Sequence, residues 1–491
     1  MKSKFSKVLS ILLSVVLVIS SFYLLYQVIR LNVLPSKFLF PLTIGVVVLD
    51  AIFILLLIYF SKNVVSKIVC ILLTLFICVA TCMGGYYISK TQNVLSSITN
   101  VAKHAKNTVS VIVKESSSIK NKSQLNDVSV GSLRLNEQGS KKVLKELSGE
   151  GIVLNQTEYD SMTALLEAFY NGEVDSIIIN ESSRSQILDM EAYSNFDSNT
   201  RVVYQTSYKV KNNDSATSVS DITSKPFNVL ISGSDTRGGF DENGRSDVIM
   251  IATVNPKTHT ILLTSVPRDF YVTTACDAGD GCMQGALDKI THTGIHGTNT
   301  TKRTVEQLLG IEINYTFKVG FDTVTELVDV LGGVDVYVEP GYATTTSEFS
   351  VHEGVNHLNA QQALAFARER YSYTEGDRQR TKNQQQVLMG IVKEATKPSV
   401  ITNYAAIMDT MANTFSTTMS NEEITDLIKY QLNNNPTWKM EQYMVDGTGD
   451  TLMCAELGDA ASVMVPDQST VKMAKDKINA VLAGKSSEDV K

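Results

Sequence analysis

The side chains best suited to chemistry lie in one short segment, residues 365–384. It carries four arginines, Arg368, Arg370, Arg378 and Arg380, around a polar turn. Arginine presents a rigid, always-charged fork that matches phosphate oxygens two at a time. Because the net charge of the whole chain is −7, this local cluster predicts an anion site and no nucleic-acid partner. The alternative is a solvated helix with its salt bridges.

Helix phase brings these residues together. A helix beginning at Asp377 puts Asp377, Arg380 and Gln384 at positions i, i+3 and i+7, on one face. Arg368 and Arg370 are two residues apart, so they share a side only if the chain has left the helix there. The polar turn allows that, and the two elements would then converge on one anion.

A glycine-rich loop that follows an apolar strand at residues 227–232 offers a second set of groups. It contains Asp235 and Arg237 and ends at Asp247, where the next strand opens. A loop between adjacent strand ends can bring Asp235 and Asp247 together, and two carboxylates suit Mg²⁺. The loop lacks the Lys-Ser/Thr ending of a phosphate-binding Walker loop. The alternative is an Asp/Gly-rich turn with capping carboxylates.

More charged residues follow another apolar strand later in the same region of the chain. Arg268 and Asp269 end an apolar strand, and Lys289 and His292 come shortly afterwards. Ligands bind beyond strand ends in open α/β sheets, which favours a role in the same site. The alternatives are an ordinary surface ion pair for Arg268 and Asp269 and a structural role for His292.

Three apolar stretches open the chain, at roughly residues 8–29, 38–60 and 68–88. Each reaches the roughly 20 residues that a helix needs to cross a bilayer. Three lysines precede the first stretch and favour a cytoplasmic N-terminus, although the first connection, which then lies outside, is also basic. We predict a multi-pass cell-membrane protein that is extracellular after about Ser89.

The remaining chain alternates short strands and helices, which is typical of α/β domains. A helical stretch is expected over about Thr91–Asn107, and a polar linker over Lys209–Ser224. The predicted domains are a transmembrane part over residues 1–90, an accessory α/β domain with its linker over 91–224, a catalytic domain over 225–397 and its extension over 398–491.

Two cysteines, Cys276 and Cys282, lie close together in a Gly/Asp loop. Outside the membrane such a pair can form a disulfide that closes a small loop. Cys454 is then left as an unpaired or buried thiol. A zinc site is disfavoured, because no second Cys or His pair has ligand spacing.

Six motifs in order resemble those of the LytR–CpsA–Psr (LCP) family and cover about residues 227–395. They are Phe227-Asn-Val-Leu-Ile-Ser-Gly-Ser-Asp235-Thr-Arg, Arg245-Ser-Asp247, Val266-Pro-Arg268-Asp269, Asp288-Lys-Ile-Thr-His, Phe366-Ala-Arg368-Glu-Arg370 and Asp377-Arg-Gln-Arg380. The apolar anchor and accessory module resemble the capsule-type CpsA (Wzg) branch of Gram-positive cocci. His296-Gly-Thr-Asn departs from the Gly-Gly pair that many relatives show.

This resemblance implies an αβα layered catalytic domain with a mixed central sheet, whose apolar interior accepts a polyprenyl tail. It implies a phosphotransferase that moves a glycopolymer, here capsular polysaccharide, from an undecaprenyl-pyrophosphate carrier onto peptidoglycan. The lipid bilayer, capsule polymerisation and export proteins and a tyrosine-kinase complex are further implied partners. The alternatives are a membrane-bound regulator or scaffold of capsule synthesis, and a lipid pyrophosphatase. The short cytoplasmic parts leave no room for a helix-turn-helix.

The resemblance also assigns roles to the charged side chains. Asp235 and Asp247 lie at a Mg²⁺ site, with Mn²⁺ as the alternative ion, and the catalytic group is Asp235, Arg268, Asp269 and Arg370. Asp235 or Asp269 is the expected proton acceptor. The residues expected to bind pyrophosphate, directly or as helpers, are Arg237, Arg268, Lys289, Arg368, Arg370, Asp377, Arg378, Arg380 and Gln384.

Overall fold

The structure, a computed structural model, describes residues 2–60, 63–101, 104–211, 216–234, 242–277, 281–397, 406–407, 410 and 415–491. Its contacts divide the chain into two units. The first comprises residues 1–97, 395–412 and 420–437, and the second comprises residues 98–394, 413–419 and 438–491.

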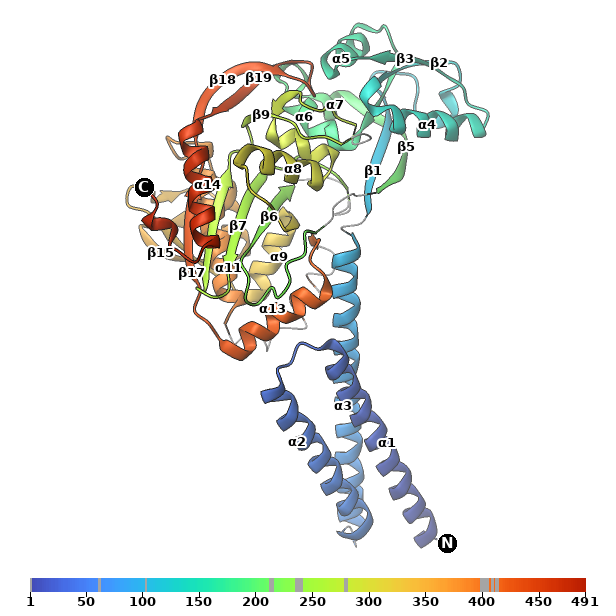
Figure 1. The fold of residues 1–491 in the computed structure, drawn as a ribbon. Helices are drawn as coiled ribbons and strands as arrows, with labels where there is room; N and C mark the ends of the chain where they lie inside the picture. The colour runs from blue at the N-terminus through green and yellow to red at the C-terminus, as the bar shows by residue number, and fades with distance from the viewer. Residues whose placement is uncertain are drawn as a thin grey trace. The chain divides into compact units, whose positions relative to one another are not determined.

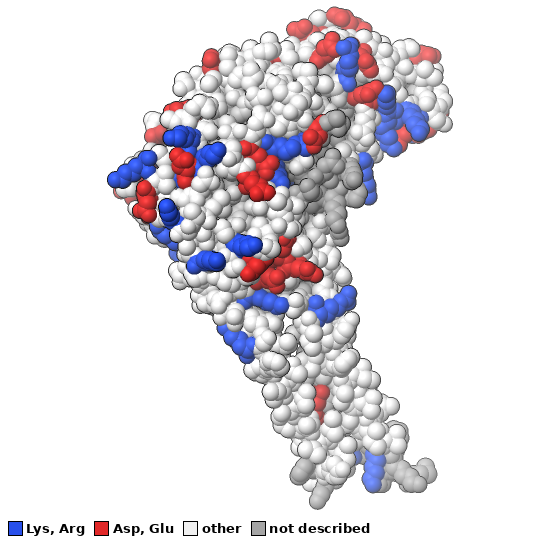
Figure 2. Space-filling view, viewed as in Figure 1, with Lys and Arg blue, Asp and Glu red and all other residues white. Residues whose placement is uncertain are grey.

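The first unit contains the apolar helices. They are α1 (Lys2–Leu31), α2 (Ser36–Leu55), which a π-helical turn (Leu56–Phe60) continues, and α3 (Val64–Val101). All three are long and apolar enough to cross a membrane, and charged side chains are sparse on the face of them that Figure 2 shows. The helical stretch predicted over about Thr91–Asn107 is confirmed as far as Val101, where α3 ends, whereas a strand begins at His104.

An additional helix, α13 (Asn421–Asn434), belongs to the same unit. Lys429 Nζ donates to Asn32 Oδ1 at 2.7 Å, and Lys37 Nζ donates to the Asn433 carbonyl at 2.5 Å. Both contacts lie at the connection between α1 and α2. This helix was missing from the sequence prediction, although Ser420 and Glu423 form a capping box and apolar residues recur at helical spacing from Ile424.

The second unit begins with the accessory domain, a five-stranded sheet in the order β3-β2-β4-β1-β5. Both faces are covered, with α4 packed on one and α5, α6 and α7 on the other. Double-sided burial explains the continuous apolar run Ile177–Ile179 of β4, in which alternate residues enter opposite cores. The bounds are β1 (His104–Lys114), β2 (Val128–Leu133), α4 (Glu137–Gly149), β3 (Leu154–Tyr159), α5 (Met162–Asn171), β4 (Ser176–Asn180), α6 (Arg184–Asp189), α7 (Phe196–Asn199) and β5 (Thr200–Lys211).

The main sheet has six strands in the order β16-β11-β6-β7-β8-β17. It is mixed, because β11 pairs with β6 and β17 with β8 in parallel, while the other neighbours are antiparallel. The bounds are β6 (Phe227–Ser234), β7 (Val248–Asn255), β8 (Thr260–Val266), β11 (Tyr315–Gly320), β16 (Phe415–Thr417) and β17 (Lys439–Met444).

Helices cover both faces of this sheet. On one face α8 (Thr298–Leu309) and α14 (Gln468–Leu482) pack their apolar side chains against β7 and β8. The other face carries α9 (Phe321–Leu331), α10 (Ala360–Arg368) and α11 (Asp377–Ala395) (Figure 1). The predicted fold class, an α/β chain with an αβα layered domain and a mixed sheet, is confirmed.

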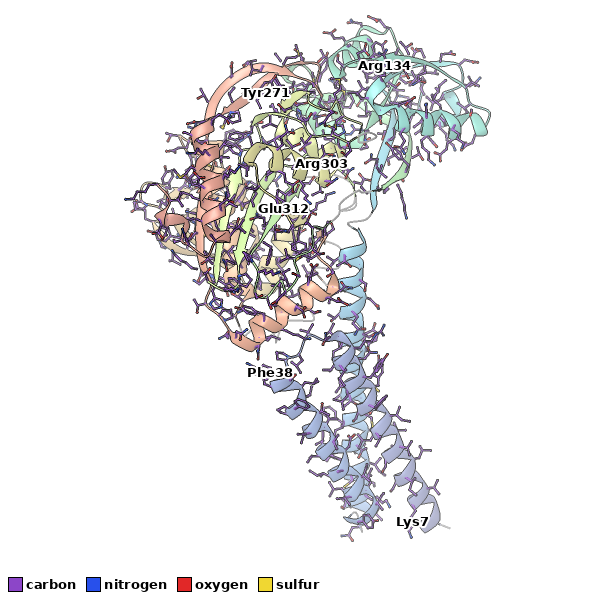
Figure 3. The ribbon with its side chains drawn as sticks, viewed as in Figure 1. Lys7, Phe38, Arg134, Tyr271, Arg303 and Glu312 are labelled. Carbon is purple, nitrogen blue, oxygen red and sulfur yellow. A yellow bond between two sulfur atoms is a disulfide. The ribbon has the colours of Figure 1, made fainter. Side chains whose placement is uncertain are left out.

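Short hairpins complete the domain. Tyr271 of β9 donates its hydroxyl to the Met453 carbonyl of β18 at 2.7 Å, which ties two of them together (Figure 3). The strands are β9 (Tyr271–Thr273), β10 (Leu287–Lys289), β12 (Val334–Val338), β13 (Thr344–Thr345), β14 (Ser350–Val351), β15 (Gly354–Leu358), β18 (Gly447–Cys454) and β19 (Asp459–Pro466).

The part of the chain after residue 398 is more structured than the sequence suggested. It supplies both edge strands of the main sheet, β16 and β17. Strand β17 is polar, Lys-Met-Glu-Gln-Tyr-Met, yet its Glu441 is only 4% exposed. The Ser487 backbone N–H donates to Glu441 Oε2 at 2.8 Å. This hydrogen bond lets a carboxylate occupy a buried strand position, where an apolar residue would have made the strand predictable from the sequence.

Candidate functional site

Arg268 lies at the centre of the charged residues beyond β7 and β8. Its Nη1 donates to Asp247 Oδ1 at 2.9 Å, and its Nε lies 3.8 Å from Asp269 Oδ2. Lys289 Nζ lies 3.3 Å from Asp269 Oδ1. The side chain of Arg268 is 18% exposed. Burial lowers the pKa of Arg268, but the charges of Asp247, Asp269 and Asp377 outweigh it and raise the pKa, so the guanidinium stays charged.

Strand register places these groups at one edge. In the antiparallel pair of β7 and β8, Ile249 lies opposite Val266. The residue that precedes β7, Asp247, therefore meets Arg268, which follows β8. The Asp247 backbone N–H donates to the Gly233 carbonyl of β6 at 2.8 Å, which continues the ladder to the first strand of the sheet.

A second arginine approaches Asp247 from the other side. Arg245 Nη2 lies 3.8 Å from Asp247 Oδ2, while the Thr291 hydroxyl donates to Oδ1 at 3.4 Å. The Asp247 side chain is 10% exposed. Arg245 belongs to the motif Arg245-Ser-Asp247 but was not among the predicted site residues, although its position two residues before Asp247 was a signal for such a role.

Helix α11 delivers the next arginine. It begins at Asp377, as predicted, and Arg380 Nη2 lies 2.5 Å from Asp377 Oδ1. Burial lowers the pKa of Arg380, and so do the positive charges of Arg268 and Arg370. The carboxylates of Asp377 and Asp247 raise the pKa but are outweighed. The charges of Arg268 and Arg370, which lie on other segments of the chain, therefore both act on the Arg380 guanidinium.

The other arginines of the segment have different surroundings. Arg370 Nη2 donates to the Tyr371 hydroxyl at 2.5 Å, and its guanidinium lies 4.7 Å from the Tyr371 ring centroid. Arg378 Nη2 binds Asp446 Oδ1 and the Gly447 carbonyl, each at 2.8 Å, so this arginine is directed toward the segment between β17 and β18. Arg368 ends α10 with an exposed side chain.

Several buried donors in this cluster have unused hydrogen-bonding capacity. Among the residues that the structure describes, the Nε atoms of Arg245, Arg268 and Arg380 are buried without a hydrogen-bond partner. A buried unsatisfied donor costs free energy, and three of them in one charged cluster indicate a ligand with oxygen acceptors. A phosphate group supplies such acceptors and matching charge.

An apolar pocket adjoins the cluster between the sheet and helices α9 to α11. Gln384 is among its lining residues, one helical turn after Arg380. The remaining wall is almost entirely apolar. It includes Ile231, Val248, Met250, Val319, Val324, Leu364, Ala367, Val387, Leu388 and Ile391.

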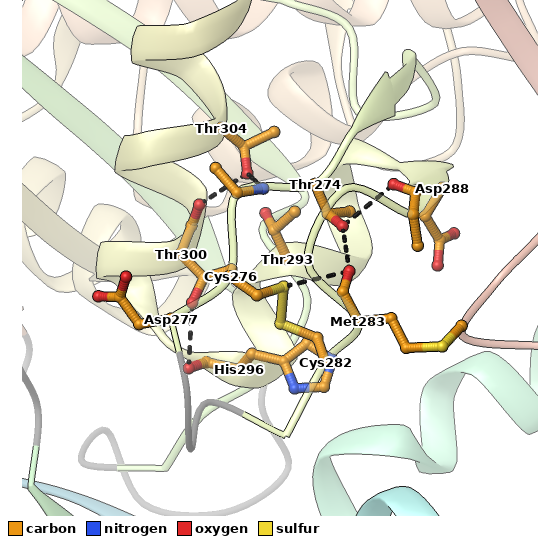
Figure 4. The surroundings of a disulfide bond; sticks show 12 residues. Thr274, Cys276, Asp277, Cys282, Met283, Asp288, Thr293, His296, Thr300 and Thr304 are labelled. Atoms are coloured by element: carbon orange, nitrogen blue, oxygen red, sulfur yellow. Dashed lines mark hydrogen bonds between the residues drawn. A yellow bond between two sulfur atoms is a disulfide. The ribbon is translucent and has the colours of Figure 1, made fainter.

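The predicted pairing of Cys276 with Cys282 is confirmed, with the sulfurs 2.02 Å apart (Figure 4). Nearby, Asp288 Oδ1 lies 2.7 Å from His292 Nδ1, and both side chains are buried, which favours the structural interpretation of His292. Cys454 is a buried free thiol, and burial together with the Asp288 charge raises its pKa to about 12.

Asp235 and Arg237 lie outside the described residues. Among the described ones, no three His, Cys, Asp or Glu side chains form a group that could hold a metal ion. Asp247 offers one carboxylate at the site, and this fits Mg²⁺, which binds through one or two carboxylates together with substrate phosphates.

Several known proteins are similar to this chain. The profile of the LytR_cpsA_psr family matches residues 192–480. The chain is 31% identical over 241 residues to the polyisoprenyl-teichoic acid–peptidoglycan teichoic acid transferase TagU of Bacillus cereus (strain AH820), covering 48% of this chain and 76% of the relative. TagU of Bacillus subtilis (strain 168) is 34% identical over 203 residues, 41% of this chain and 63% of its own.

Among solved structures, a crystal structure of B. subtilis TagU is 28% identical and covers 52% of this chain and 97% of its own, with a TM-score of 0.40. The family match extends over more than half of the chain and includes the arginine cluster, Asp247 and the apolar pocket. This chain belongs to the LytR_cpsA_psr family.

Proposed function

We propose that this protein is a membrane-anchored transferase that moves a glycopolymer from a polyprenyl-pyrophosphate carrier onto peptidoglycan. The observation that carries the proposal is the junction of a half-buried arginine cluster with an apolar pocket, which suits a ligand with an anionic head and a lipid tail. The TagU relatives are named for the same class of transfer. Capsular polysaccharide is the proposed polymer and undecaprenyl the proposed lipid.

In the proposed reaction a hydroxyl of the wall glycan attacks the phosphorus that carries the polymer. A new oxygen–phosphorus bond forms while the bond to the polyprenyl phosphate breaks, so the carrier leaves as polyprenyl phosphate and a phosphodiester remains. Asp235 or Asp269 accepts the hydroxyl proton. Phosphoryl transfer depends on positioning and charge neutralisation, which Arg268, Arg370 and Arg380 supply.

We propose Asp235 and Asp247 as the protein ligands of Mg²⁺. The bound ion neutralises phosphate charge in this class of chemistry. The chain's own contribution is to hold Asp247 between the Arg245 and Arg268 guanidinium groups.

The proposed orientation has a cytoplasmic N-terminus and an extracellular site. An anchor keeps the site near a lipid-borne donor, which raises its effective concentration. Peptidoglycan, the bilayer, capsule polymerisation and export proteins and a tyrosine-kinase complex are the proposed partners.

The direct test uses the full-length protein in lipid nanodiscs with a polyprenyl-pyrophosphate-linked glycopolymer, with and without peptidoglycan. We expect polymer on peptidoglycan and matching release of polyprenyl phosphate. Release with no transfer to the acceptor would instead show a lipid pyrophosphatase. If neither occurs, the proposal is wrong and a scaffold or regulator is favoured.

The polymer is identified separately, by wall fractionation of a strain that lacks the protein. Loss of wall-bound capsular polysaccharide supports the capsule assignment. Loss of teichoic acid would contradict that assignment and leave the transferase proposal intact.

A further inference from the structure

The segment Glu242–Asp247, which leads into the site, is held at its start by the accessory domain. Glu242 forms a parallel β-bridge with Lys106 of β1, and Lys106 Nζ lies 3.3 Å from Glu242 Oε1. The Thr108 hydroxyl donates to the same carboxylate oxygen. The Glu242 side chain is only 9% exposed, so its charge depends on these partners.

The accessory domain reaches the same segment a second time through Arg245. Asp189, the last residue of α6, forms an ion pair with Arg245 Nη1. The other terminal nitrogen of Arg245 lies 3.8 Å from Asp247 Oδ2. One guanidinium, 13% exposed, therefore stands between a carboxylate of the accessory domain and a carboxylate of the site.

The rest of the segment has little freedom to absorb a displacement. The Ser246 backbone N–H donates to the Thr291 carbonyl at 3.0 Å, and its hydroxyl lies 2.8 Å from that of Ser232. A Cβ atom at Gly294 would lie 2.5 Å from the Gly244 carbonyl oxygen, so this glycine permits close packing against the segment. A shift at Glu242 or Arg245 should therefore reach Asp247.

We propose that the accessory domain positions the Asp247 carboxylate through Glu242 and Arg245, and so sets the affinity of the site for pyrophosphate. Asp189 draws Arg245 away from Asp247, so that the Asp247 carboxylate holds the Arg268 guanidinium in position for the anionic ligand. Without Asp189, Arg245 closes on Asp247 and competes with Arg268 for it. The pyrophosphate part of this inference rests on the proposed function; the coupling between the two domains does not.

Other contacts keep the accessory domain in place when Asp189 is changed. Met190 packs against the cluster of Cys454, Leu457 and Val463, and the Thr163 backbone N–H donates to the Leu457 carbonyl at 3.4 Å. A change at Asp189 therefore tests positioning and not detachment of the domain.

The test compares Asp189→Asn and Lys106→Met with the control Asp197→Asn in the full-length protein in nanodiscs. Asp197 pairs with Arg184 at 2.9 Å inside the accessory domain. Asp189→Glu tests rescue by a longer carboxylate. Hydrogen exchange of the backbone amides of residues 243–248, affinity for farnesyl pyrophosphate and Tm are measured for each.

We expect affinity to fall about 3-fold in Asp189→Asn, because its exposed carboxylate gives a modest ion pair. In Lys106→Met, which leaves the buried Glu242 less compensated, we expect a fall of about 10-fold. Hydrogen exchange of residues 243–248 should be faster in Asp189→Asn and in Lys106→Met. The Tm of Asp189→Asn should be close to that of the wild type. Asp189→Glu should restore the wild-type exchange rate and affinity.

The positioning role would be overturned if Asp189→Asn and Lys106→Met both showed the same hydrogen-exchange rates and the same affinity for farnesyl pyrophosphate as Asp197→Asn. Faster hydrogen exchange in the variants would confirm the coupling between the two domains even if the wild-type protein bound no farnesyl pyrophosphate. That lack of binding would contradict the proposed function.

Discussion

At the scale of single residues, the charges of the site meet at Arg268 and Asp247. A half-buried guanidinium and a half-buried carboxylate stabilise each other, and Asp269, Arg245 and Arg380 extend the network. The Nε atoms of Arg245, Arg268 and Arg380 are buried without a hydrogen-bond partner among the described residues, and an anion would supply acceptors for them. The arrangement favours a phosphate ligand over a neutral one.

Replacing Arg268 should abolish most of the activity. We expect Arg268→Ala to lower the rate of polymer transfer by about 100-fold or more, since it removes a preorganised charge at the phosphates. Transfer is measured with the full-length protein in nanodiscs.

Arg303→Ala is the matched control. Arg303 lies on α8, on the opposite face of the sheet, and pairs with Asp277 (Figure 3). Transfer at the wild-type rate in a folded Arg268→Ala protein would contradict the assignment of the site.

At the scale of elements, the gap between the main sheet and helices α10 and α11 forms the apolar part of the site. Side chains such as Ala367 and Val387 line this gap, whereas on the opposite face the side chains of α8 and α14 form a continuous apolar core with the strands. The pocket therefore arises from how the layers are filled.

Filling this gap should separate lipid binding from phosphate binding. We expect Ala367→Phe to weaken farnesyl pyrophosphate binding by about 10-fold, because the ring occupies space that the lipid needs. Affinity for inorganic pyrophosphate should stay at the wild-type value.

Gln361→Phe, an exposed position on the same helix, controls for the added ring. Equal losses for both ligands in Ala367→Phe would show general misfolding and would not support a lipid pocket.

Edge strand β17 carries a pH-dependent contribution to stability. Burial raises the pKa of Glu441, but Lys439, Ser487 and Ser486 outweigh it and lower the pKa to about 2. A lowered pKa means that the ionised form stabilises the fold above the unfolded pKa of roughly 4.3. This contribution is lost as pH falls from there toward 2.

We therefore expect Glu441→Gln to lower Tm at pH 7, by an amount that shrinks as pH falls below about 5. Thermal unfolding of the two proteins across pH measures the difference. Glu488→Gln is the control, because Glu488 binds the same lysine but is exposed, and it should change Tm little. A pH-independent loss in Glu441→Gln would contradict the ionic explanation.

At the scale of the whole molecule, three apolar helices and a charged site occur in one chain. A transferase that takes a substrate from a lipid carrier needs both. The proposed orientation also agrees with the disulfide, since such bonds persist in oxidising compartments outside the cytoplasm.

Protease treatment of intact cells tests this orientation. We expect the part of the chain after Ser89 to be digested and a tag at the N-terminus to be protected, because three crossings put them on opposite sides. Cells opened by detergent provide the control in which both are cut. Protection of the C-terminal part in intact cells would place the site in the cytoplasm and contradict the transfer to peptidoglycan.

Features that depend on a local pattern could be predicted from the amino-acid sequence. Helix phase from Asp377 predicted Arg380 near Gln384, strand alternation predicted an α/β fold, and the length of the apolar runs predicted three spans. The close spacing of Cys276 and Cys282 predicted their disulfide. In each case the determining interaction lies within a few residues or a single element.

Features that depend on residues far apart in the chain became evident from the three-dimensional structure. Strand β17 escaped notice because its buried Glu441 is satisfied by Ser487, 46 residues later. Arg378 belongs to the same arginine-rich segment as Arg380, yet its guanidinium binds Asp446 and Gly447, away from Arg268. The role of Arg245 follows from Asp189 of another domain. Long-range register and domain packing fix such pairs, and no local spacing in the chain encodes them.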